Sequence, residues 1–318
     1  MLNSICDVPG ILVGHAQNTK GGTGCTVIIA EEMAACGVNV AGGGPGTRET
    51  DALNPVNLVH AVNAVYLGGG SAYGLAGADG VMQWCEDNGK GFDVGVGIVP
   101  IVPGAVLFDL PVADYKARPD AAMGYAACEN ASSTEARMGN VGAGTGATVG
   151  KSRGMQGIMK GGLGTASVKI GEVIIGAIVA VNCFGNVQDP ETGETIAGVI
   201  PEDGGDFKPP THYLRQAIST GINPLGGNTT IGAIATNAKL NKVQATKVSM
   251  MSHDGYARAI NPIHTMHDGD TIFTLSTGEV EADVSSIGAI AAEVMAKAIA
   301  AGVSAAKTAY GFPGHAGE

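Results

Sequence analysis

Residues 173–182, Val-Ile-Ile-Gly-Ala-Ile-Val-Ala-Val-Asn, restrict the fold more than any other stretch of the sequence. The β-branched residues among them favour a strand. Since no polar residue alternates with the apolar ones, both faces of this strand must be covered by other parts of the chain. The run is too short to span a bilayer. Residues 167–170 precede it, and the Gly171-Glu172 pair between them predicts two strands joined by a tight turn.

The composition favours an enzyme-sized globular protein and argues against nucleic-acid partners. With 318 residues, 45% of them hydrophobic, the chain can bury a large core. Its 51 glycines follow no triplet period, so they mark turns and close backbone approaches rather than a fibrous repeat. The net charge of −11 and the 4% aromatic content argue against binding to a phosphate backbone or to single-stranded nucleic acid.

Cysteine usage and the N-terminal sequence predict a cytoplasmic location. Six cysteines are scattered without a C-x-x-C pair, which suits a reducing compartment better than a disulfide framework or a zinc site. Asp7 and His15 lie where a secretory signal would be apolar. We therefore expect a soluble cytoplasmic protein with no membrane partner.

Hydrophobic periodicity predicts a mixed α/β chain without internal repeats. Strands are expected over residues 11–13, 25–30, 229–236 and 271–275. Helices are expected around Leu58, Val59, Val62 and Val65, from a cap at Ser71 to a stop at Asn88-Gly89, and over 114–133, 240–260 and 285–306. Prolines interrupt residues 94–106, which indicates an edge or bent strand, and residues 186–210 have the composition of a surface loop.

Three glycine-rich segments are candidate ligand-binding loops. Residues 68–71 and 142–147 imitate nucleotide-binding motifs, but neither has G-x-G-x-x-G with an acidic residue about 20 positions later, nor a G-K-[ST] ending. A dinucleotide site is therefore not expected. The loop over residues 41–51 is compatible with anion binding and with a purely structural connection.

Residues 226–237 contain a possible site of chain cleavage. Gly226, Gly227 and Asn228 lead into Thr229, which opens an apolar, β-branched run, so a loop ends where a strand begins. Breaking the Asn228-Thr229 bond would give Thr229 a free α-amine beside its hydroxyl, an arrangement used in nucleophilic catalysis. That amine, with a reference pKa of about 7.7–8.0, can accept the hydroxyl proton. The alternative is an ordinary turn that enters a buried strand.

Several segments, in order along the chain, resemble a family of self-cleaving N-terminal-nucleophile amidohydrolases. The family includes the L-aminopeptidase/D-amidase-esterases, the β-peptidyl aminopeptidases and the nylon-oligomer endo-hydrolases. The similar segments are residues 8–15 (Val-Pro-Gly-Ile-Leu-Val-Gly-His), 44–51 (Gly-Pro-Gly-Thr-Arg-Glu-Thr-Asp), 67–75 (Leu-Gly-Gly-Gly-Ser-Ala-Tyr-Gly-Leu), 181–182 (Val-Asn) and 228–230 (Asn-Thr-Thr). The resemblance covers nearly the whole chain.

The resemblance implies an α/β fold, a four-layer αββα sandwich with helices outside two central sheets. It implies self-cleavage into a large subunit, residues 1–228, and a small subunit, residues 229–318, which together form one folded domain. It also implies a tetramer of such processed heterodimers, and catalysis without a metal or organic cofactor.

The resemblance further implies a site made of Thr229, Lys151, Asn182, Asp268 and Asp270. Thr229 would be the nucleophile. An ammonium at Lys151 would favour the uncharged amine, and Asn182 would donate to the oxyanion. Asp268 and Asp270 would orient the amine and hydroxyl, and in the precursor they would help Thr229 attack the carbonyl of Asn228. Each of these residues alone also has an ordinary structural explanation. Lys151 could be a surface lysine, Asn182 could simply end a strand, and Asp268 and Asp270 could belong to an Asp-Gly-Asp turn.

The acidic pair and the threonine make this chain most similar to the nylon-oligomer hydrolase branch, since the β-peptidyl aminopeptidases use a serine nucleophile with a serine and a glutamate downstream. Phe108 stands where some members have a tyrosine. If that tyrosine donates to the oxyanion, the donor is missing here or comes from elsewhere, for example from Tyr73 or Tyr115.

The function implied is hydrolysis of small linear amides through an acyl-enzyme on Thr229. The substrate classes are 6-aminohexanoate oligomers, short peptides and amino-acid amides. One alternative is an aminopeptidase/D-amidase-esterase, and a second is acyl transfer of the ornithine acetyltransferase type. The alternative outside enzymes is an uncleaved ligand-binding protein of the same fold.

Overall fold

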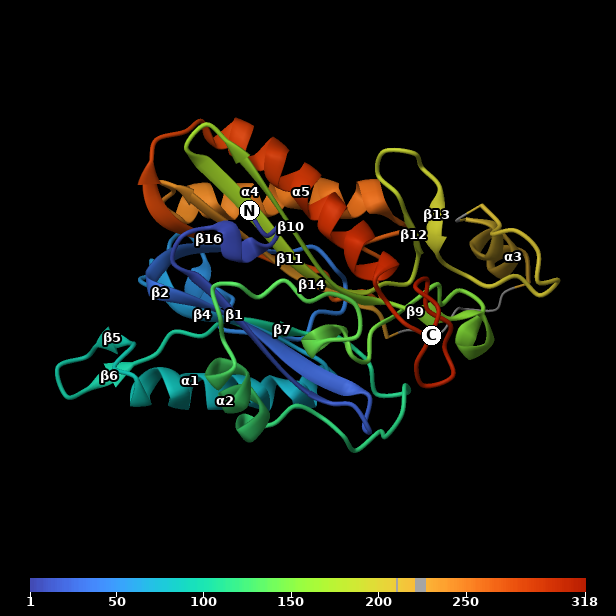
Figure 1. Ribbon diagram of the computed structural model, residues 1–318, viewed down its shortest axis with the longest axis horizontal. Helices are drawn as coiled ribbons and strands as arrows, with labels where there is room; N and C mark the ends of the chain where they lie inside the picture. The colour runs from blue at the N-terminus through green and yellow to red at the C-terminus, as the bar shows by residue number, and fades with distance from the viewer. Residues whose placement is uncertain (210, 221–226) are drawn as a thin grey trace.

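The computed structural model describes residues 1–209, 211–220 and 227–318, and these form four layers (Figure 1). Helices α4 (Lys242–Ala259) and α5 (Val284–Ser304) cover the outer face of one sheet. Helices α1 (Gly77–Asp87) and α2 (Ala121–Glu129) cover the outer face of the other. The predicted αββα sandwich is confirmed.

The long strand β2 (Thr23–Val40) joins the two layers, called here the first and second sheets, into one continuous hydrogen-bonded sheet. Its residues 35–40 pair with β16 (Thr271–Val280), and its residues 23–30 pair with β1 (Ile11–Asn18). Its pairing with β4 shifts register between Ile29 and Ala34, where the intervening residues 31–33 are exposed. The first sheet holds the later half of β2 with β16 (Thr271–Val280), β14 (Thr229–Ala238), β11 (Val173–Asn182) and β10 (Gly162–Ile170). The second holds the earlier half with β1 (Ile11–Asn18), β4 (Ala61–Gly68), β7 (Gly104–Val106) and β3 (Thr47–Arg48).

Strand β11 demonstrates why the sequence demands layers on both sides. Ile178 and Ala180 face the core between the sheets, whereas Val179 and Val181 face α4 and α5. All four are buried, and each large aliphatic side chain removed from water contributes about 1.5–3 kcal/mol. The predicted two-sided burial of this strand and its tight turn to β10 are both confirmed.

Helix α5 packs on β10, β11 and α4 along an alanine-rich face. Asp283 caps it by accepting a hydrogen bond from the backbone N–H of Ser286 at 2.8 Å. By length and composition α5 could cross a membrane, and here Met295 and Ile299 are completely buried against the sheet. The helices predicted over 240–260 and 285–306 are confirmed, and that predicted over 114–133 is shorter, as α2.

The helix predicted around Leu58, Val62 and Val65 is wrong, because residues 61–68 form the central strand β4. Its residues are buried on both faces, so apolar side chains also occur at the spacing expected of a helix. The cap predicted at Ser71 is also wrong. The turn of 3-10 helix Ser71–Ala76 follows Gly70, whose N–H donates to Asp109 at 2.6 Å, and Ser71 makes no capping bond.

The region predicted as a surface loop, residues 186–210, is partly sheet. Strand β12 (Asn186–Gln188) pairs with β13 (Thr195–Ala197) and β15 (Ile260–Asn261), whereas residues 191–194 and 202–207 are exposed. Pro210 lies outside the described residues, and helix α3 (His212–Thr220) follows it. In place of the single bent strand expected over 94–106, the structure has two short strands, β6 (Ile98–Val99) and β7. Strand β6 pairs with β5 (Phe92–Asp93). Strands β8 (Thr148–Val149) and β9 (Met159–Lys160) form a further pair.

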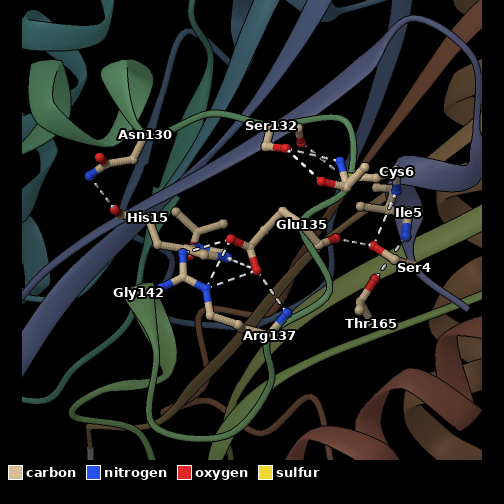
Figure 2. A network of polar contacts seen from close by, with 12 residues as sticks. Ser4, Ile5, Cys6, His15, Asn130, Ser132, Glu135, Arg137, Gly142 and Thr165 are labelled. Atoms are coloured by element: carbon tan, nitrogen blue, oxygen red, sulfur yellow. Dashed lines mark hydrogen bonds and ion pairs between the residues drawn. The ribbon is translucent and has the colours of Figure 1, made fainter. Parts of the chain in front are cut away.

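A polar network ties the N-terminal residues to the loop after α2 (Figure 2). The carboxylate of Glu135 binds the guanidinium of Arg137, and the Glu135 carbonyl accepts from the hydroxyl of Ser4 at 2.6 Å. His15 Nδ1 lies 2.9 Å from the hydroxyl of Thr26, and its Nε2 lies 3.9 Å from Glu135. Burial lowers the pKa of His15 to about 4, so this ring is neutral at pH 7.

Candidate active site

Thr229 is the first residue of β14, between β11 and β16 (Figure 1). It is opposite Asn182, the last residue of β11, in the antiparallel pairing of these strands. Thr229 is 4% exposed, and its hydroxyl donates to the carbonyl oxygen of Asn228, the residue before it. The predicted loop-to-strand boundary is confirmed on the described side, while Gly226 lies outside the described residues.

The turn before β16 approaches this junction through its backbone. The N–H of Gly269 points between two oxygens, 3.2 Å from the carbonyl of Asn228 and 3.1 Å from the hydroxyl of Thr229. A Cβ at position 269 would lie 2.7 Å from that hydroxyl, so this position requires glycine. Sequence reasoning overlooked Gly269, because a backbone donor leaves no mark except the absent side chain.

Asp270 holds the backbone at the start of β14. One of its oxygens accepts from the N–H of Thr230 at 2.7 Å, and the other accepts from Nδ1 of His264 at 2.8 Å and from the His264 N–H at 3.1 Å. The carboxylate is completely buried. Asp270 therefore positions Thr229 through the peptide group between Thr229 and Thr230. His264, which donates to Asp270, is a second site residue that the sequence analysis did not identify.

Asp268 lies beside Asn228, with which it forms a parallel β-bridge. One carboxylate oxygen accepts from the N–H of Thr265 at 2.7 Å, and the other is buried without a hydrogen-bond partner among the described residues. Burial, followed by repulsion from Asp270, raises the pKa of Asp268 to about 6. At neutral pH this carboxyl group is thus ionised yet close to its titration range.

The glycine-rich loop 41–51 supports this acidic turn. The N–H of Ala41 donates to the carbonyl of Asp270 at 2.9 Å, and that of Gly44 to the carbonyl of Asp268 at 2.8 Å. Gly42 packs so closely that a Cβ would lie 2.2 Å from the Asp268 carbonyl oxygen. Of the two interpretations left open for this loop, these contacts correspond to the structural connection.

Lys151 reaches the junction by way of Asn182. Its ammonium donates to the backbone carbonyl and to the side-chain oxygen of Asn182, at 3.0 and 2.9 Å, and lies 3.4 Å from the carbonyl oxygen of Gly227. Burial lowers the pKa of Lys151 to about 8. The amide nitrogen of Asn182 donates to the carbonyl of Phe108 at 3.1 Å. Lys151 thus contacts Asn182, which lies opposite Thr229 in the pairing of β11 with β14.

Phe108, which stands where some members of the family have a tyrosine, offers no hydrogen-bond donor and forms an apolar wall. Its ring packs against Gly227, which has φ +112° and no room for a Cβ. Tyr73 and Tyr115, named as replacement donors, are each more than half exposed and stack on the guanidinium of Arg118. Neither lines a cavity beside Thr229.

Two cavities meet at Phe108 and Gly227. One, of about 260 Å³, has Thr229 and Asn228 in its lining together with polar Ser71 and His267. The other, of about 310 Å³, is mostly apolar and contains Lys151 and Thr148. All five residues predicted for the site, and the predicted cleavage junction, are therefore gathered in one place although they span positions 151 to 270.

Comparison with known sequences identifies relatives along the whole chain. The profile of peptidase family S58 matches residues 3–317. An uncharacterized aminopeptidase of Mycobacterium tuberculosis is 41% identical over 98% of this chain and 96% of its own length. A 6-aminohexanoate-oligomer endohydrolase of an Agromyces species is 31% identical over 92% of this chain and 84% of its own length.

Solved structures share the fold at lower identity. An L-aminopeptidase D-Ala-esterase/amidase from Ochrobactrum anthropi, a variant of the Ntn hydrolase fold, matches with a TM-score of 0.72 and 19% identity over 96% of this chain and 87% of its own. A β-aminopeptidase from a Burkholderia species matches with a TM-score of 0.71 and 20% identity over 99% of this chain and 91% of its own.

Proposed function

This chain belongs to peptidase family S58 and is a hydrolase of amide bonds, and we propose that it cleaves itself between Asn228 and Thr229 and then uses Thr229 as an N-terminal nucleophile. One observation carries the proposal. The hydroxyl of Thr229 contacts the carbonyl of Asn228, while the N–H of Gly269 lies 3.2 Å from the same carbonyl oxygen. A nucleophile and an oxyanion donor thus face one peptide bond.

Self-cleavage begins when the oxygen of Thr229 attacks the carbonyl carbon of Asn228. The negative charge that develops on the carbonyl oxygen is stabilised by the Gly269 N–H. Asp268, whose second oxygen has no partner among the described residues, accepts the hydroxyl proton. The C–N bond then breaks, the freed nitrogen takes up a proton, and an ester joins Asn228 to Thr229. Water hydrolyses this ester, which leaves a carboxylate on Asn228 and a free amine on Thr229.

In the mature enzyme the α-amine of Thr229 removes the hydroxyl proton and later returns it to the leaving amine of the substrate. The ammonium of Lys151 favours the uncharged amine, and Asp268 and Asp270 orient it. The amide of Asn182 and the N–H of Gly269 are the oxyanion donors of this scheme. Water then releases the acyl group from Thr229. No step of this scheme calls for a metal or an organic cofactor.

The substrates proposed are linear amides: 6-aminohexanoate oligomers, short peptides or amino-acid amides. The names of the aminopeptidase and endohydrolase relatives support this range. Acyl transfer of the ornithine acetyltransferase type is the rival reaction, and an assay with an added amine acceptor separates transfer from hydrolysis. An uncleaved ligand-binding protein would show neither reaction.

Residues 1–228 and 229–318 would remain one folded unit after cleavage. Strand β14 stays paired between β11 and β16, and α4 and α5 stay packed on the sheet. A tetramer of such processed units, in the cytoplasm, completes the proposal. The six cysteines, all free and buried, are compatible with a reducing compartment.

Denaturing gels and N-terminal sequencing test the proposal directly. The wild-type chain should yield a 90-residue fragment that begins at Thr229, about 9 kDa of the 31.7 kDa total. Thr229→Ala should give only the intact chain and no turnover, whereas Thr229→Ser should still process. An active preparation that contains only the intact chain would refute the proposal.

Asn182 provides a second test that separates turnover from maturation. Asn182→Ala should still process, because the N–H of Gly269 stabilises the charge that develops on the Asn228 carbonyl oxygen. Its turnover should fall about 10²–10³-fold, because one oxyanion donor is lost. Near-normal turnover of the processed variant would remove Asn182 from the site.

A further inference from the structure

We propose that Asp109 and Lys160, two buried charged residues to which the scheme above gives no part, are positioning residues for the side-chain amide of Asn182. This inference rests on the proposed function, in which that amide is an oxyanion donor. It deepens the function by naming the groups that fix the donor before a substrate binds. A donor fixed in advance needs no reorganisation when charge develops on the substrate.

Two backbone groups from distant parts of the chain hold the amide of Asn182. Its oxygen accepts from the N–H of Thr148 at 3.0 Å, and its nitrogen donates to the carbonyl of Phe108 at 3.1 Å. An amide nitrogen has two hydrogens, so the bond to Phe108 also sets the direction of the second one. That second hydrogen is the one that the proposed function assigns to the oxyanion. The direction of the donor therefore depends on how these two backbone groups are anchored.

Asp109 anchors the peptide group that contains the Phe108 carbonyl. The side chain of Asp109 is buried, and its two oxygens accept from the N–H of Gly70 at 2.6 Å and from the hydroxyl of Thr23 at 2.7 Å. The residue before Phe108 is held to the same loop, because its N–H and carbonyl form hydrogen bonds of 2.8 and 2.9 Å with residues 68 and 71. The Phe108 carbonyl is thus fixed from both sides.

Lys160 anchors the peptide group that contains the Thr148 N–H. Its side chain is completely buried, and its ammonium donates to the carbonyls of Thr145 and Ala147 at 2.9 and 2.6 Å. The carbonyl of Ala147 and the N–H of Thr148 belong to one peptide group. Lys160 therefore holds the same peptide group that donates to Asn182, and a hydrogen bond at its carbonyl polarises its N–H.

The two charged groups also act on one segment, residues 145–147. A Cβ on Gly146 would lie 2.6 Å from a carboxylate oxygen of Asp109, so this carboxylate packs against the backbone that binds Lys160 on the two sides of Gly146. Burial lowers the pKa of Lys160 to about 7, and attraction to Asp109 opposes this change. Loss of either charge should loosen the segment and move the amide of Asn182.

Lys160→Met tests the inference by kinetics, because methionine fills the buried space but cannot donate to the two carbonyls. The variant should process like the wild type, since the N–H of Gly269 stabilises the charge on the Asn228 carbonyl oxygen. Its kcat should fall about tenfold or more while KM changes less than about twofold, because the misplaced donor acts in the transition state. The probe is leucyl p-nitroanilide or the linear 6-aminohexanoate trimer, whichever the wild type hydrolyses faster.

Two variants at exposed positions are the matched controls. Lys307→Met and Asp114→Asn should leave kcat unchanged, whereas Asp109→Asn should lower it at least about fivefold. Asp109→Asn keeps the shape of the side chain and an acceptor for Gly70, so it serves as the test if Lys160→Met does not fold. An unchanged kcat, or equal losses of processing and turnover, would overturn the inference.

The Asn182→Ala background separates positioning from a general structural role. Once the amide is absent, Lys160→Met and Asp109→Asn should lower kcat by less than about twofold further, because the group that they position is gone. A structural role would lower kcat by the same factor in both backgrounds, and that result would refute the assignment.

Crystal structures of the uncleaved Thr229→Ala chain, with and without Lys160→Met or Asp109→Asn, test the geometry without any activity. At least one of the two hydrogen bonds of the Asn182 amide, 3.0 Å to Thr148 and 3.1 Å to Phe108 here, should lengthen beyond about 3.5 Å in the variants. An amide that does not move overturns the inference and leaves the proposed function in place. Processed wild-type enzyme that hydrolyses neither probe would count against the function, and the crystal structures would still decide the inference.

Discussion

The backbone N–H of Gly269 lies 3.2 Å from the carbonyl oxygen of Asn228, although the two residues belong to segments 41 positions apart. The β-bridge between Asn228 and Asp268 aligns the segments, and the same N–H is 3.1 Å from the hydroxyl of Thr229. A backbone donor held by sheet pairing needs no reorganisation when charge develops on the carbonyl, which is the condition for effective oxyanion stabilisation.

Gly269→Ala should slow self-cleavage. The added Cβ would lie 2.7 Å from the Thr229 hydroxyl and 3.0 Å from the carbonyl oxygen of Gly44, so the turn or the nucleophile must move. A misplacement of about 1 Å at a reacting group costs about 10²-fold in rate. Cleavage is followed by gel densitometry after cell-free synthesis. Gly97→Ala, where a Cβ meets nothing within 4 Å, is the control, and equal processing of both variants would contradict this role.

His264 should act as a positioning residue for Asp270. His264→Leu removes the 2.8 Å bond from Nδ1 and leaves one buried carboxylate oxygen with only a backbone donor. A hydrogen bond to a charged group contributes about 1.5–3 kcal/mol, so processing and turnover should each fall at least about tenfold. His264→Asn should rescue both rates, because its side-chain amide can replace the Nδ1 donor.

The control for this prediction is His60→Leu, a change of the same residue type at an exposed position. A purely structural role for His264 would lower the thermal unfolding temperature of both variants at 264 without rescue of the rates by asparagine. The rates and the unfolding temperature should therefore be measured on the same preparations.

The pH profile of the mature enzyme should shift in opposite directions when charges near Thr229 are removed. Lys151→Met takes away a like charge, so the α-amine becomes more basic and the acidic limb of kcat/KM moves to higher pH. Asp270→Asn takes away an attractive charge, so the limb moves to lower pH. Each shift should be about 1 pH unit.

Processed protein is required for that comparison, so the 229–318 piece should be produced with a removable leader and combined with residues 1–228. If both variants lose activity while the limb stays in place, these side chains position groups rather than tune the amine. The base would then have to be another group.

Acid should destabilise the fold through His15. Its pKa is about 4 in the folded chain, because burial disfavours the charged ring, against an ordinary value of 6.5. The unfolded chain therefore binds a proton first, and this contribution to stability is complete above pH 6.5 and is lost as the pH falls toward 4. Between pH 7 and pH 5 the loss is about 2 kcal/mol.

Urea unfolding of the uncleaved Thr229→Ala chain at both pH values measures this effect. Adding His15→Gln should make the free energy of unfolding less sensitive to pH over this interval, though lower at pH 7 because the contact with Thr26 changes. Glu135 and Arg137 face His15 in the same network and stay charged between pH 5 and pH 7 (Figure 2). An unchanged pH dependence in the double variant would exclude His15 as the titrating group.

The local sequence determined much of the architecture. The apolar strand β11 and the helices α4 and α5 were predictable, because their side-chain patterns reflect burial directly. Motif resemblance supplied the fold class and the set of residues that the structure brings together around Thr229. Their catalytic roles stay predictions until the variants above are measured.

Only the tertiary structure decided the rest. Strand β4 is buried on both faces, so its sequence lacks the alternation that distinguishes a strand from a helix. The donor at Gly269 is a backbone group, and His264 reaches Asp270 because of the turn that joins them, so neither has a side-chain pattern to detect. The apolar cavity beside Lys151 is lined by Phe108, Met155 and Phe312, which are distant in sequence and become neighbours only when the chain folds. Sequence periodicity records which residues are buried, whereas long-range packing sets which buried groups meet.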